Sequence, residues 1–505
     1  MSVFKKLTGQ VATYGVSSIL GRVINFLLVP IYTDSRLTGI NLQDFGIYTE
    51  LYASMAFLNI IYLFGLETTF FRFSTKETLD REKVYNTIQS SLLVTSFILS
   101  FFLISVSGYL SSVLGYPDKQ SYIVMLAAIL FVDAIVAIPF ARLRLENNAV
   151  KFASLKLANI FLNVFFNLFF LLFCRKVYLG ETAPFLKPAI DLIYIPGFEV
   201  GYIILSNLLA NTLQIPFLSR QFKKLRFQLS PRYLKPIYQY AYPLMFMGLA
   251  GMVNEVLDRI LLRVALPENF YPHLSTIEAI GVYGACYKLS MFMSLTIQAF
   301  RYAAEPFFFN QAKEKNAPEQ FAAIMKYFII FCSLIYVLVS CNLSIFGLIL
   351  RNPVFRQGLD IVPLLLLANL FLGIYINLSV WYKLTDKTYA GTVITFAGAA
   401  ITIASNWLLI PFMGYMGAAA TTLLCYSGMA IIAYFWGQKH FPVPYHVKSA
   451  LFYLTLASGL IWINNSYLLK NGLNAYISGI GISAGYLILV VSLEYRSIRK
   501  SIPQG

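Results

Sequence analysis

The stretch Tyr240-Ala-Tyr-Pro-Leu-Met-Phe-Met-Gly-Leu-Ala-Gly-Met-Val253 begins as an ordinary membrane-spanning helix. Four charged residues then follow within nine positions of otherwise apolar sequence: Glu255, Asp258, Arg259 and Arg263. A charge at the centre of a bilayer costs roughly 2.5–3.5 kcal/mol on the insertion scale, so four of them need ion partners or a hydrated cavity. On a helix, positions 255, 259 and 263 share one stripe, with 258 beside it. The sequence thus predicts a charged helix inside an apolar protein.

A second apolar stretch, Ile280–Met291, follows after a short loop and contains one further charge, Lys288. Two interpretations fit these charges. They are structural ion pairs near a helix end, or they line a path for something that crosses the membrane. We favour the second interpretation as a working hypothesis.

Composition defines the broad class of the protein. Of the 505 residues, 58% are hydrophobic and 12% are charged, and the mean hydropathy is +0.67. A soluble protein would have about 25% charged residues, so the sequence predicts an all-α, polytopic membrane protein. The net charge of +16 comes from basic residues in short loops between apolar spans, as the positive-inside rule predicts. We therefore expect membrane lipids, and no nucleic acid, as partners.

The cysteines and histidines give no sign of a metal site or a disulfide framework. The five cysteines are scattered through apolar stretches without a C-x-x-C pair, which is typical of small buried residues. The three histidines have no neighbours at metal-ligand spacing. We expect no metal and no cofactor, and leave open a coupling ion, H⁺ or Na⁺. The apolar segment near the N-terminus lacks a cleavage site and is interpreted as an uncleaved first span.

About 20 apolar residues are needed to cross a bilayer, and by this rule the sequence predicts fourteen spans. They cover roughly residues 11–33, 45–66, 88–114, 121–141, 152–174, 196–218, 238–264, 279–301, 322–350, 360–382, 389–410, 415–436, 449–465 and 474–494.

Loop charges predict the orientation. With the N-terminus inside, 27 lysine and arginine residues lie on the cytoplasmic side and eight on the other, which places both termini in the cytoplasm. We divide the chain into two pseudo-symmetric six-helix lobes, 1–219 and 237–437. A basic cytoplasmic linker, 220–236, joins them, and a helix pair with a cytoplasmic tail occupies 438–505.

A weak internal repeat supports two lobes. Asn25-Phe-Leu-Leu-Val-Pro-Ile-Tyr32 parallels Asp258-Arg-Ile-Leu-Leu-Arg-Val-Ala265, and Gly46-Ile-Tyr48 parallels Gly281-Val-Tyr283 at a similar offset. Each lobe has an even number of spans, so both insert the same way round. The predicted pseudo-two-fold axis therefore runs along the membrane normal, with a cavity between the lobes.

Charges in the first spans of each lobe supply the candidate site. In span one a polar stripe recurs at helical spacing: Tyr14, Ser18, Arg22 and Asn25. The residues that we expect to contact a cargo are Arg22, Lys288, Arg259 and Asn25. The acids expected to couple to an ion or to pair internally are Glu50, Asp133, Glu255 and Asp258. Arg259 ranks below Arg22 and Lys288 because Glu255 lies one turn before it.

Catalytic motifs are missing from the sequence. We find no G-x-x-x-x-G-K-[ST] phosphate loop, no nucleophile elbow and no His/Glu metal motif. The longest outer loop, about 175–195, is too short for a soluble domain. We therefore expect that the protein is not an enzyme.

Three motifs resemble a known family. Asn406-Trp-Leu-Leu-Ile-Pro-Phe-Met-Gly-Tyr-Met-Gly-Ala-Ala-Ala-Thr-Thr422 is similar to the late signature of bacterial polysaccharide flippases, in which a turn at Pro411 and Gly414 joins two closely packed spans. Asp258-Arg-Ile-Leu-Leu262 followed by Gly281-Val-Tyr283 resembles the second-half signature. With the fourteen-span layout, the resemblance covers essentially the whole chain.

This family belongs to the superfamily of multidrug, oligosaccharidyl-lipid and polysaccharide exporters. The resemblance implies two lobes that open alternately to each side of the bacterial inner membrane. It also implies a cargo, undecaprenyl-pyrophosphate-linked oligosaccharide for O-antigen or exopolysaccharide, and contacts with other polysaccharide-assembly proteins. In such proteins basic cavity residues receive the pyrophosphate–sugar headgroup, a role that Arg22 and Lys288 match by position.

Three alternatives remain. A multidrug cation extruder of the same fold would favour acids in the first lobe and twelve spans. A lipid II flippase would place an acid directly beside Arg22. A membrane-embedded polysaccharide polymerase or ligase, from a different class, would carry a large outer loop with acidic and basic residues.

Overall fold

The structure is a computed structural model of the chain, and it describes residues 19–75, 79–146, 148–223, 225–311, 314, 316–385 and 387–501. Throughout these ranges the regular structure is helical and no strand occurs, which confirms the predicted all-α fold class. Tyr14 and Ser18 of the predicted polar stripe lie outside the described residues.

The chain forms two compact units. The first contains the described residues up to Arg263 together with His273–Gly281, and the second contains Val264–Pro272 together with the chain from Val282 onward. Helix α14 therefore groups with the first unit almost to its end. The division into two six-helix lobes joined by the linker 220–236 remains a prediction.

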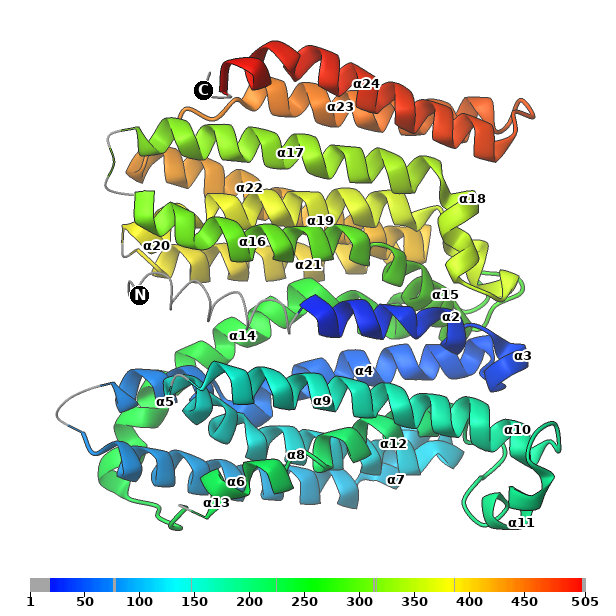
Figure 1. The fold of residues 1–505 in the computed structure, drawn as a ribbon, viewed down its shortest axis with the longest axis vertical. Coiled ribbons are helices and arrows are strands. Elements are labelled where there is room, and N and C mark those ends of the chain that lie inside the picture. Colours follow the sequence, from blue (N-terminus) through cyan, green and yellow to red (C-terminus); the bar gives the residue numbers. More distant parts are fainter. Residues whose placement is uncertain are drawn as a thin grey trace. The chain divides into compact units, whose positions relative to one another are not determined.

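The first unit is built from long helices joined by short helical turns (Figure 1). In chain order they are Ile19–Tyr32 (ending in α2, Val29–Tyr32), α3 (Ser35–Thr38), α4 (Leu42–Leu63), α5 (Leu66–Ser74), α6 (Arg81–Ser105), α7 (Ser107–Val113), α8 (Gln120–Leu145), α9 (Ala149–Leu168) continuing as a π-helix (Phe169–Cys174), α10 (Arg175–Tyr178), α11 (Lys187–Ile190), α12 (Glu199–Thr212), α13 (Ser219–Phe222) and α14 (Pro231–Ala265).

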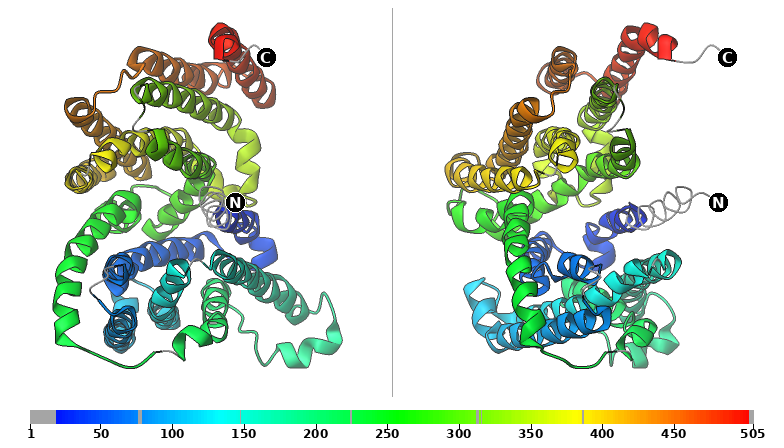
Figure 2. Two further views of the ribbon diagram at one scale, coloured as in Figure 1. Left: turned by 60° about the vertical axis from the view of Figure 1, so that its left-hand side comes forward. Right: turned by 90° about the vertical axis from the view of Figure 1, so that its left-hand side faces the viewer.

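The second unit continues the all-helical pattern. Its helices are α16 (Met291–Gln311), α17 (Ala317–Cys341), α18 (Leu343–Phe346), α19 (Ile361–Leu378), α20 (Val380–Leu384), α21 (Tyr389–Met413), α22 (Tyr415–His440), α23 (Val447–Ile463) and α24 (Ala475–Ser501). Helix α15 (Thr276–Leu289) belongs to the first unit up to Gly281 and to the second from there on. The last two helices both pack against α17, as two views show (Figures 1 and 2).

Local chemistry explains where α4 begins and ends. At its start the Asn41 side chain accepts from the Asp44 amide (2.8 Å) while the Asp44 carboxylate accepts from the Asn41 amide (3.4 Å), a capping box. At its end Phe64 and Gly65 adopt positive φ angles of 50° and 69°. These left-handed residues end α4 close to the predicted end of the second span, and α5 begins directly after them.

The number of spans differs from the predicted fourteen. Eleven described helices are long and apolar enough to cross a membrane, or twelve if α15 and α16, bent by 43°, count as one span. The two expected spans outside this count are the first and the seventh. The first is described only from Ile19, and α14 is long but carries the four charges discussed above. The fourteen-span count therefore remains a prediction.

The core of the first unit lies between α4, α5, α6, α8 and the start of α14. Its buried members include Tyr62, Phe70, Ile88, Leu130 and Ala241. This packing holds the beginning of α14 against α4 and so determines which charges of α4 and α14 can form ion pairs.

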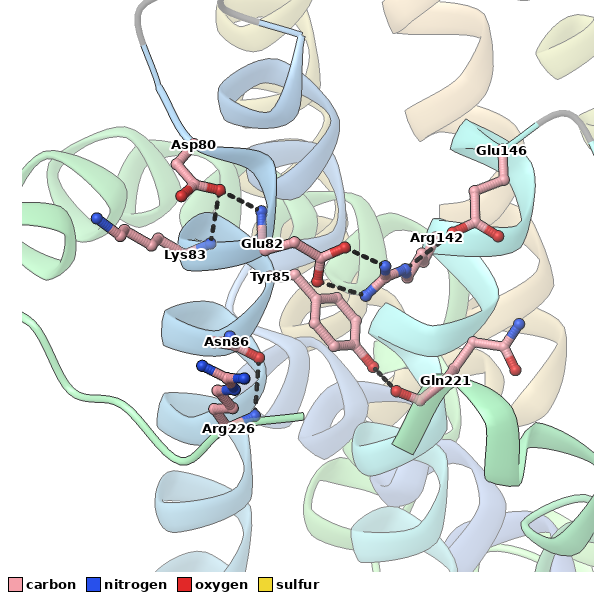
Figure 3. A network of polar contacts seen from close by, with 9 residues as sticks. All are labelled: Asp80, Glu82, Lys83, Tyr85, Asn86, Arg142, Glu146, Gln221 and Arg226. Carbon is pink, nitrogen blue, oxygen red and sulfur yellow. Dashed lines mark hydrogen bonds and ion pairs between the residues drawn. The ribbon is translucent and has the colours of Figure 1, made fainter. Parts of the chain in front are cut away.

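The basic linker is hydrogen-bonded to α6. The Tyr85 hydroxyl donates to the Gln221 carbonyl (3.1 Å), and the Arg226 amide donates to the Asn86 side chain (3.0 Å) (Figure 3). The Gln228 amide donates to the Ser90 hydroxyl, also at 3.0 Å. The extended segment after α13 thus satisfies its backbone groups on buried polar residues of α6.

The predicted turn between the spans at 389–410 and 415–436 lies slightly later than expected. Pro411 lies inside α21, and the chain turns at Gly414, where φ is +57° and ψ is −137°. A Cβ at Gly414 would lie 2.2 Å from the Tyr271 hydroxyl, so this turn requires glycine for space as well as for conformation.

Candidate functional site

Arg263 is paired with an acid from another helix. Its Nη1 lies 3.3 Å from Oε2 of Glu50 in α4, and its Nη2 donates to the Leu114 carbonyl. The Glu50 side chain is only 3% exposed and that of Arg263 is 20% exposed. Leaving either charge alone at this depth would be costly, so the pair links α14 to α4. Two of the charges singled out in the sequence therefore form an internal ion pair.

The other charges of α14 do not pair as the helical stripe suggested. Arg259 lies 3.8 Å from the carboxylate of its neighbour Asp258, and its Nη1 donates to the backbone carbonyl, not the carboxylate, of Glu255 (3.0 Å). Asp258 is buried, whereas Glu255 is exposed. The charge of Arg259 is therefore partly neutralised by Asp258. The Glu255 carboxylate has no such role, because its side chain is exposed.

The remaining cargo candidates lie in both units. Arg22 and Asn25 are exposed on the first described helix, and Arg22 has no ion pair with a described residue. Lys288, near the end of α15 in the second unit, is partly buried. Their roles as cargo contacts remain predictions.

Asp133 lies in a buried polar network of the first unit. Asn211 of α12 donates to its carboxylate (2.7 Å), and Asn159 of α9 donates to the Asn211 amide oxygen (2.8 Å). Lys156, one turn before Asn159, lies within electrostatic range of Asp133. The predicted isolated acid is therefore held between three helices by amide side chains.

Asparagines recur at a spacing of four along α9 and α12. Those of α9 are Asn159, Asn163 and Asn167, and those of α12 are Asn207 and Asn211. This spacing keeps each set on one helix face. We call these five residues the asparagine track.

Tyrosines of α2 and α4 complete the asparagine track. The Tyr32 hydroxyl donates to Asn167 (2.9 Å), and Asn207 donates to the Tyr52 hydroxyl (3.1 Å). The rings of Tyr48 and Tyr52 lie 4.7 Å apart, and Tyr48 is 6.1 Å from Tyr32. Amides both donate and accept hydrogen bonds, and tyrosines add flat apolar faces. The track can therefore bind a polar, hydroxyl-rich group without a metal or a cofactor.

The sequence reasoning missed most of this arrangement. Lys156, one of the 27 basic residues counted on the cytoplasmic side, lies inside α9, with Nζ 4.4 Å from the Phe140 ring centroid. A signal for this arrangement was present in the sequence, because three asparagines recur at intervals of four residues in an otherwise apolar helix. Within the described residues no group of three or more His, Cys, Asp and Glu could hold a metal ion.

Comparisons with known proteins identify a family match in the first unit and relatives of the same fold. A family model described as "Polysaccharide biosynthesis protein" (Polysacc_synt_3) matches residues 36–178, a segment that carries Glu50, Asp133 and the asparagines of α9. No curated protein sequence shows a significant match.

Among solved structures, the lipid II flippase MurJ in an inward closed conformation has a TM-score of 0.72 at 12% identity, covering 96% of this chain and 99% of its own. An inward-facing multidrug resistance MATE transporter of the MOP superfamily has a TM-score of 0.62 at 12% identity, with 83% and 94% covered. A MOP superfamily transporter from Pyrococcus furiosus has a TM-score of 0.54 at 13% identity, with 86% and 95% covered.

The structural similarity establishes the fold, and sequence identities of 12–13% do not identify the cargo. The family match over residues 36–178 supports a relation to polysaccharide biosynthesis proteins, and the shared fold extends over nearly the whole chain. The chain is a multi-pass membrane protein with the architecture of flippases and transporters.

Proposed function

We propose that this chain, which has the fold of the MOP-superfamily flippases and transporters, is a flippase for an undecaprenyl-pyrophosphate-linked oligosaccharide. It moves the lipid from the cytoplasmic to the outer leaflet by alternating access, for synthesis of a cell-surface polysaccharide such as O-antigen or exopolysaccharide. The family match over residues 36–178 supports the polysaccharide pathway.

The asparagine track with its tyrosines carries this proposal. Five amides and three tyrosines in the interior of an apolar helical unit are costly unless they serve one another or a polar cargo. The inner members Tyr32 and Asn167 are 6% and 1% exposed and support the arrangement. The partly exposed members Tyr48, Asn163 and Asn207 can contact sugar hydroxyls.

A flippase must give the polar headgroup and the apolar tail of its lipid different surroundings. A sugar headgroup cannot enter hydrocarbon without hydrogen-bond partners, so it needs a polar path through the protein. The polyprenyl tail can remain in the lipid. The flippase therefore needs polar contacts for the headgroup only, and no chemical step is involved, so the protein acts as a transporter and not as an enzyme.

The charges then have separate roles. Arg22 and Lys288, with Arg259 in a weaker role and Asn25 beside Arg22, bind the pyrophosphate. Glu50 and Asp258 have arginine partners and serve as scaffold. Asp133 is the better candidate for coupling to H⁺ or Na⁺, because only neutral amides donate to it among the hydrogen bonds seen.

The cellular setting follows from the cargo. The protein acts in the bacterial inner membrane, both termini are cytoplasmic, and it works beside other polysaccharide-assembly proteins. The excess of positive charge in the predicted cytoplasmic loops supports this orientation.

The decisive experiment is translocation in proteoliposomes with a defined fluorescent undecaprenyl-pyrophosphate oligosaccharide. Protection from a membrane-impermeant quencher reports flipping. Matched vesicles carry lipid II or a fluorescent lipophilic cation. We expect flipping of the oligosaccharide lipid, and its loss when Asn163 is changed to Leu.

Each other outcome selects another function. Flipping of lipid II but not of the oligosaccharide lipid would identify a lipid II flippase. Uptake of the cation alone would identify a multidrug extruder. Chain elongation of the oligosaccharide, detected by mass spectrometry, would identify a polymerase or ligase and overturn the proposal.

A further inference from the structure

The loop between α10 and α12, residues 179–198, presents large apolar side chains although it lies between two candidate membrane spans. We call it the α10–α12 loop; it contains the short turn Pro184–Leu186 and α11. Leu192 and Phe185 are 86% and 80% exposed, the two highest values for large apolar side chains in the described part of the chain. An apolar surface of this kind is typical of a site that contacts another protein or a membrane.

A row of tyrosines holds the α10–α12 loop in this form. The ring centroids of Tyr178, Tyr194 and Tyr202 follow one another at 5.2 Å, and the Ile195 amide donates to the Tyr202 hydroxyl (2.6 Å). Ile190 and Tyr194 are each only 5% exposed, so they form the inward side of the loop. The apolar side chains are therefore divided between a packed inward set and an exposed outward set.

Two lysines fasten the loop to neighbouring elements. Lys187 Nζ donates to the Tyr178 carbonyl at the end of α10 (2.8 Å), and Lys119 Nζ donates to the Gly197 carbonyl (3.1 Å). The loop also contains three prolines, Pro184, Pro188 and Pro196. Proline fixes the φ angle, and a loop that is already ordered loses little conformational entropy when it binds. The outward side chains are thus presented in a fixed arrangement.

The exposed apolar side of α9 leads directly into the loop. The span Val150–Tyr178 is apolar, yet only 17% of its most apolar segment is buried. Its exposed phenylalanine and leucine side chains recur along one face of the helix at Phe161, Phe165, Leu168 and Phe173. The five-residue step from 168 to 173 stays on that face because the helix there is a π-helix. In a membrane-spanning helix, such a face contacts lipid.

The outward side of the loop continues this lipid-facing surface. Tyr194 packs on Tyr178, the last residue of the span, so Ile193 and Ile195 beside it lie where the span ends; they are 50% and 60% exposed. Figure 1 shows α10 and α11 beyond the end of α9, and in the left view of Figure 2 the loop extends sideways past the neighbouring helices. An apolar surface at this level faces the boundary between hydrocarbon and headgroups.

The charges of the loop indicate how it contacts that boundary. The loop has two acids, Glu181 and Asp191, and one base, Lys187, and therefore a net charge of −1. Attraction to anionic headgroups requires a cluster of basic residues, which the loop lacks. The contact is therefore apolar and independent of the headgroup charge.

We infer that the α10–α12 loop inserts its outward side chains into the interfacial region of the leaflet at the end of α9. The inserted side chains are those of Phe185, Leu192, Ile193 and Ile195. In the predicted orientation this is the outer leaflet. The loop acts as a lateral anchor that fixes the depth of this end of α9 and α12 in the membrane. This inference does not depend on which cargo is flipped.

The test measures the depth of one loop residue in a bilayer. The full chain with Leu192→Cys is labelled with the environment-sensitive fluorophore NBD and reconstituted in phosphatidylcholine vesicles. The five native cysteines are all buried, so the new thiol is labelled selectively. We expect blue-shifted emission, quenching by phospholipids with a nitroxide near the headgroup, and protection from aqueous iodide. Asp118→Cys is the control, because Asp118 is an exposed polar residue of the neighbouring turn before α8; its probe should be quenched by iodide.

A second set of variants tests which side chains drive the insertion. Adding Phe185→Ser and Ile193→Ser to the labelled chain should abolish the blue shift and most of the nitroxide quenching. Val150→Ser is the matched control, because Val150 is an equally apolar, 74% exposed residue at the other end of α9. All three side chains are exposed, so the melting temperature in detergent should stay constant. Replacing part of the phosphatidylcholine by phosphatidylglycerol should leave the quenching unchanged.

Four results would overturn the inference. Iodide quenching at Leu192 as strong as at Asp118 would show that the loop stands in water. Protection from iodide without nitroxide quenching, increasing with the protein-to-lipid ratio, would assign the surface to contact between copies of this chain. A blue shift that requires phosphatidylglycerol would show that headgroup charge holds the loop. Unchanged quenching in the double serine variant would show that these side chains do not insert.

Discussion

Glu50 and Arg263 form an ion pair of 3.3 Å between α4 and α14, although 213 residues separate them in the chain. From the sequence alone, Glu50 was expected to couple to an ion or to pair internally, and Arg263 was one of the four charges that follow Val253. In the structure they pair with each other, and the Leu114 carbonyl accepts a further hydrogen bond from Arg263. The pair therefore holds α14 on the first unit and leaves fewer charges for transport.

Removing one member of this pair should destabilise the protein. Arg263→Gln leaves Glu50 buried without its counter-charge, and we expect a loss of about 3 kcal/mol in the free energy of unfolding. The double variant Glu50→Gln/Arg263→Gln should recover part of it. Thermal unfolding in detergent measures this, with the exposed Glu255→Gln as control. Additive losses in the double variant would contradict the pair.

A close crossing of α4 and the start of α15 should be intolerant of any side chain. Within the first unit, a Cβ at Gly46 would lie 2.0 Å from the Ile277 carbonyl, and one at Gly281 would lie 2.5 Å from the Leu42 carbonyl. We expect Gly46→Ala to lower the melting temperature strongly. Gly251→Ala in α14, where nothing lies within 4 Å, should have no such effect. Equal melting temperatures would contradict this packing.

The cationic residues expected to bind the cargo provide a third prediction. Arg22→Ala and Lys288→Ala should each reduce export of the lipid-linked oligosaccharide by at least about tenfold, since each loses a charge-assisted hydrogen bond to pyrophosphate. Protein level and membrane insertion should remain normal, as measured by immunoblotting of membrane fractions. Lys83→Ala is the control. Normal export by both variants would disprove a cationic binding site.

The last helix pair should depend on one buried carboxylate. Glu494 of α24 lies 2.6 Å from Lys326 of α17 and accepts from the Tyr453 hydroxyl of α23 at 2.8 Å. Glu494→Ala removes both contacts, so hydrogen exchange in α23 and α24 should rise while that of α21 stays constant. The exposed Lys448→Gln is the control. Unchanged exchange in Glu494→Ala would show that apolar packing alone holds the pair.

Much of the fold was readable from the sequence because a bilayer allows few solutions. Apolar segments of about 20 residues must become helices, since their backbone groups have no other partners in lipid. The boundaries of α8 and α21 agree with the predicted spans to within a few residues, whereas α17 ends at Cys341, nine residues before the predicted end at 350. The turn at Phe64 and Gly65 lies at the predicted end of the second span, near residue 66, and the short helix α5 that follows was not among the predicted spans.

The site was less predictable, because partners on different helices leave no mark in local sequence. Glu255 and Arg259 have the right helical spacing, yet Arg259 forms an ion pair with Asp258 and contacts only the backbone carbonyl of Glu255. Lys156 is exposed on α9, yet it lies within electrostatic range of the partly buried Asp133. Side-chain direction and helix packing decided both cases.

The sequence by itself determined that this chain is an all-helical membrane protein and which polar residues lie inside its apolar helices. Apolar length and charge distribution are local properties, and they need no knowledge of neighbours. Only the tertiary structure decided which of the four charges after Val253 are neutralised and by which residues. Arg263 and Glu50 meet because α14 packs on α4, and a buried charge is stabilised by whatever partner packing brings within a few ångströms.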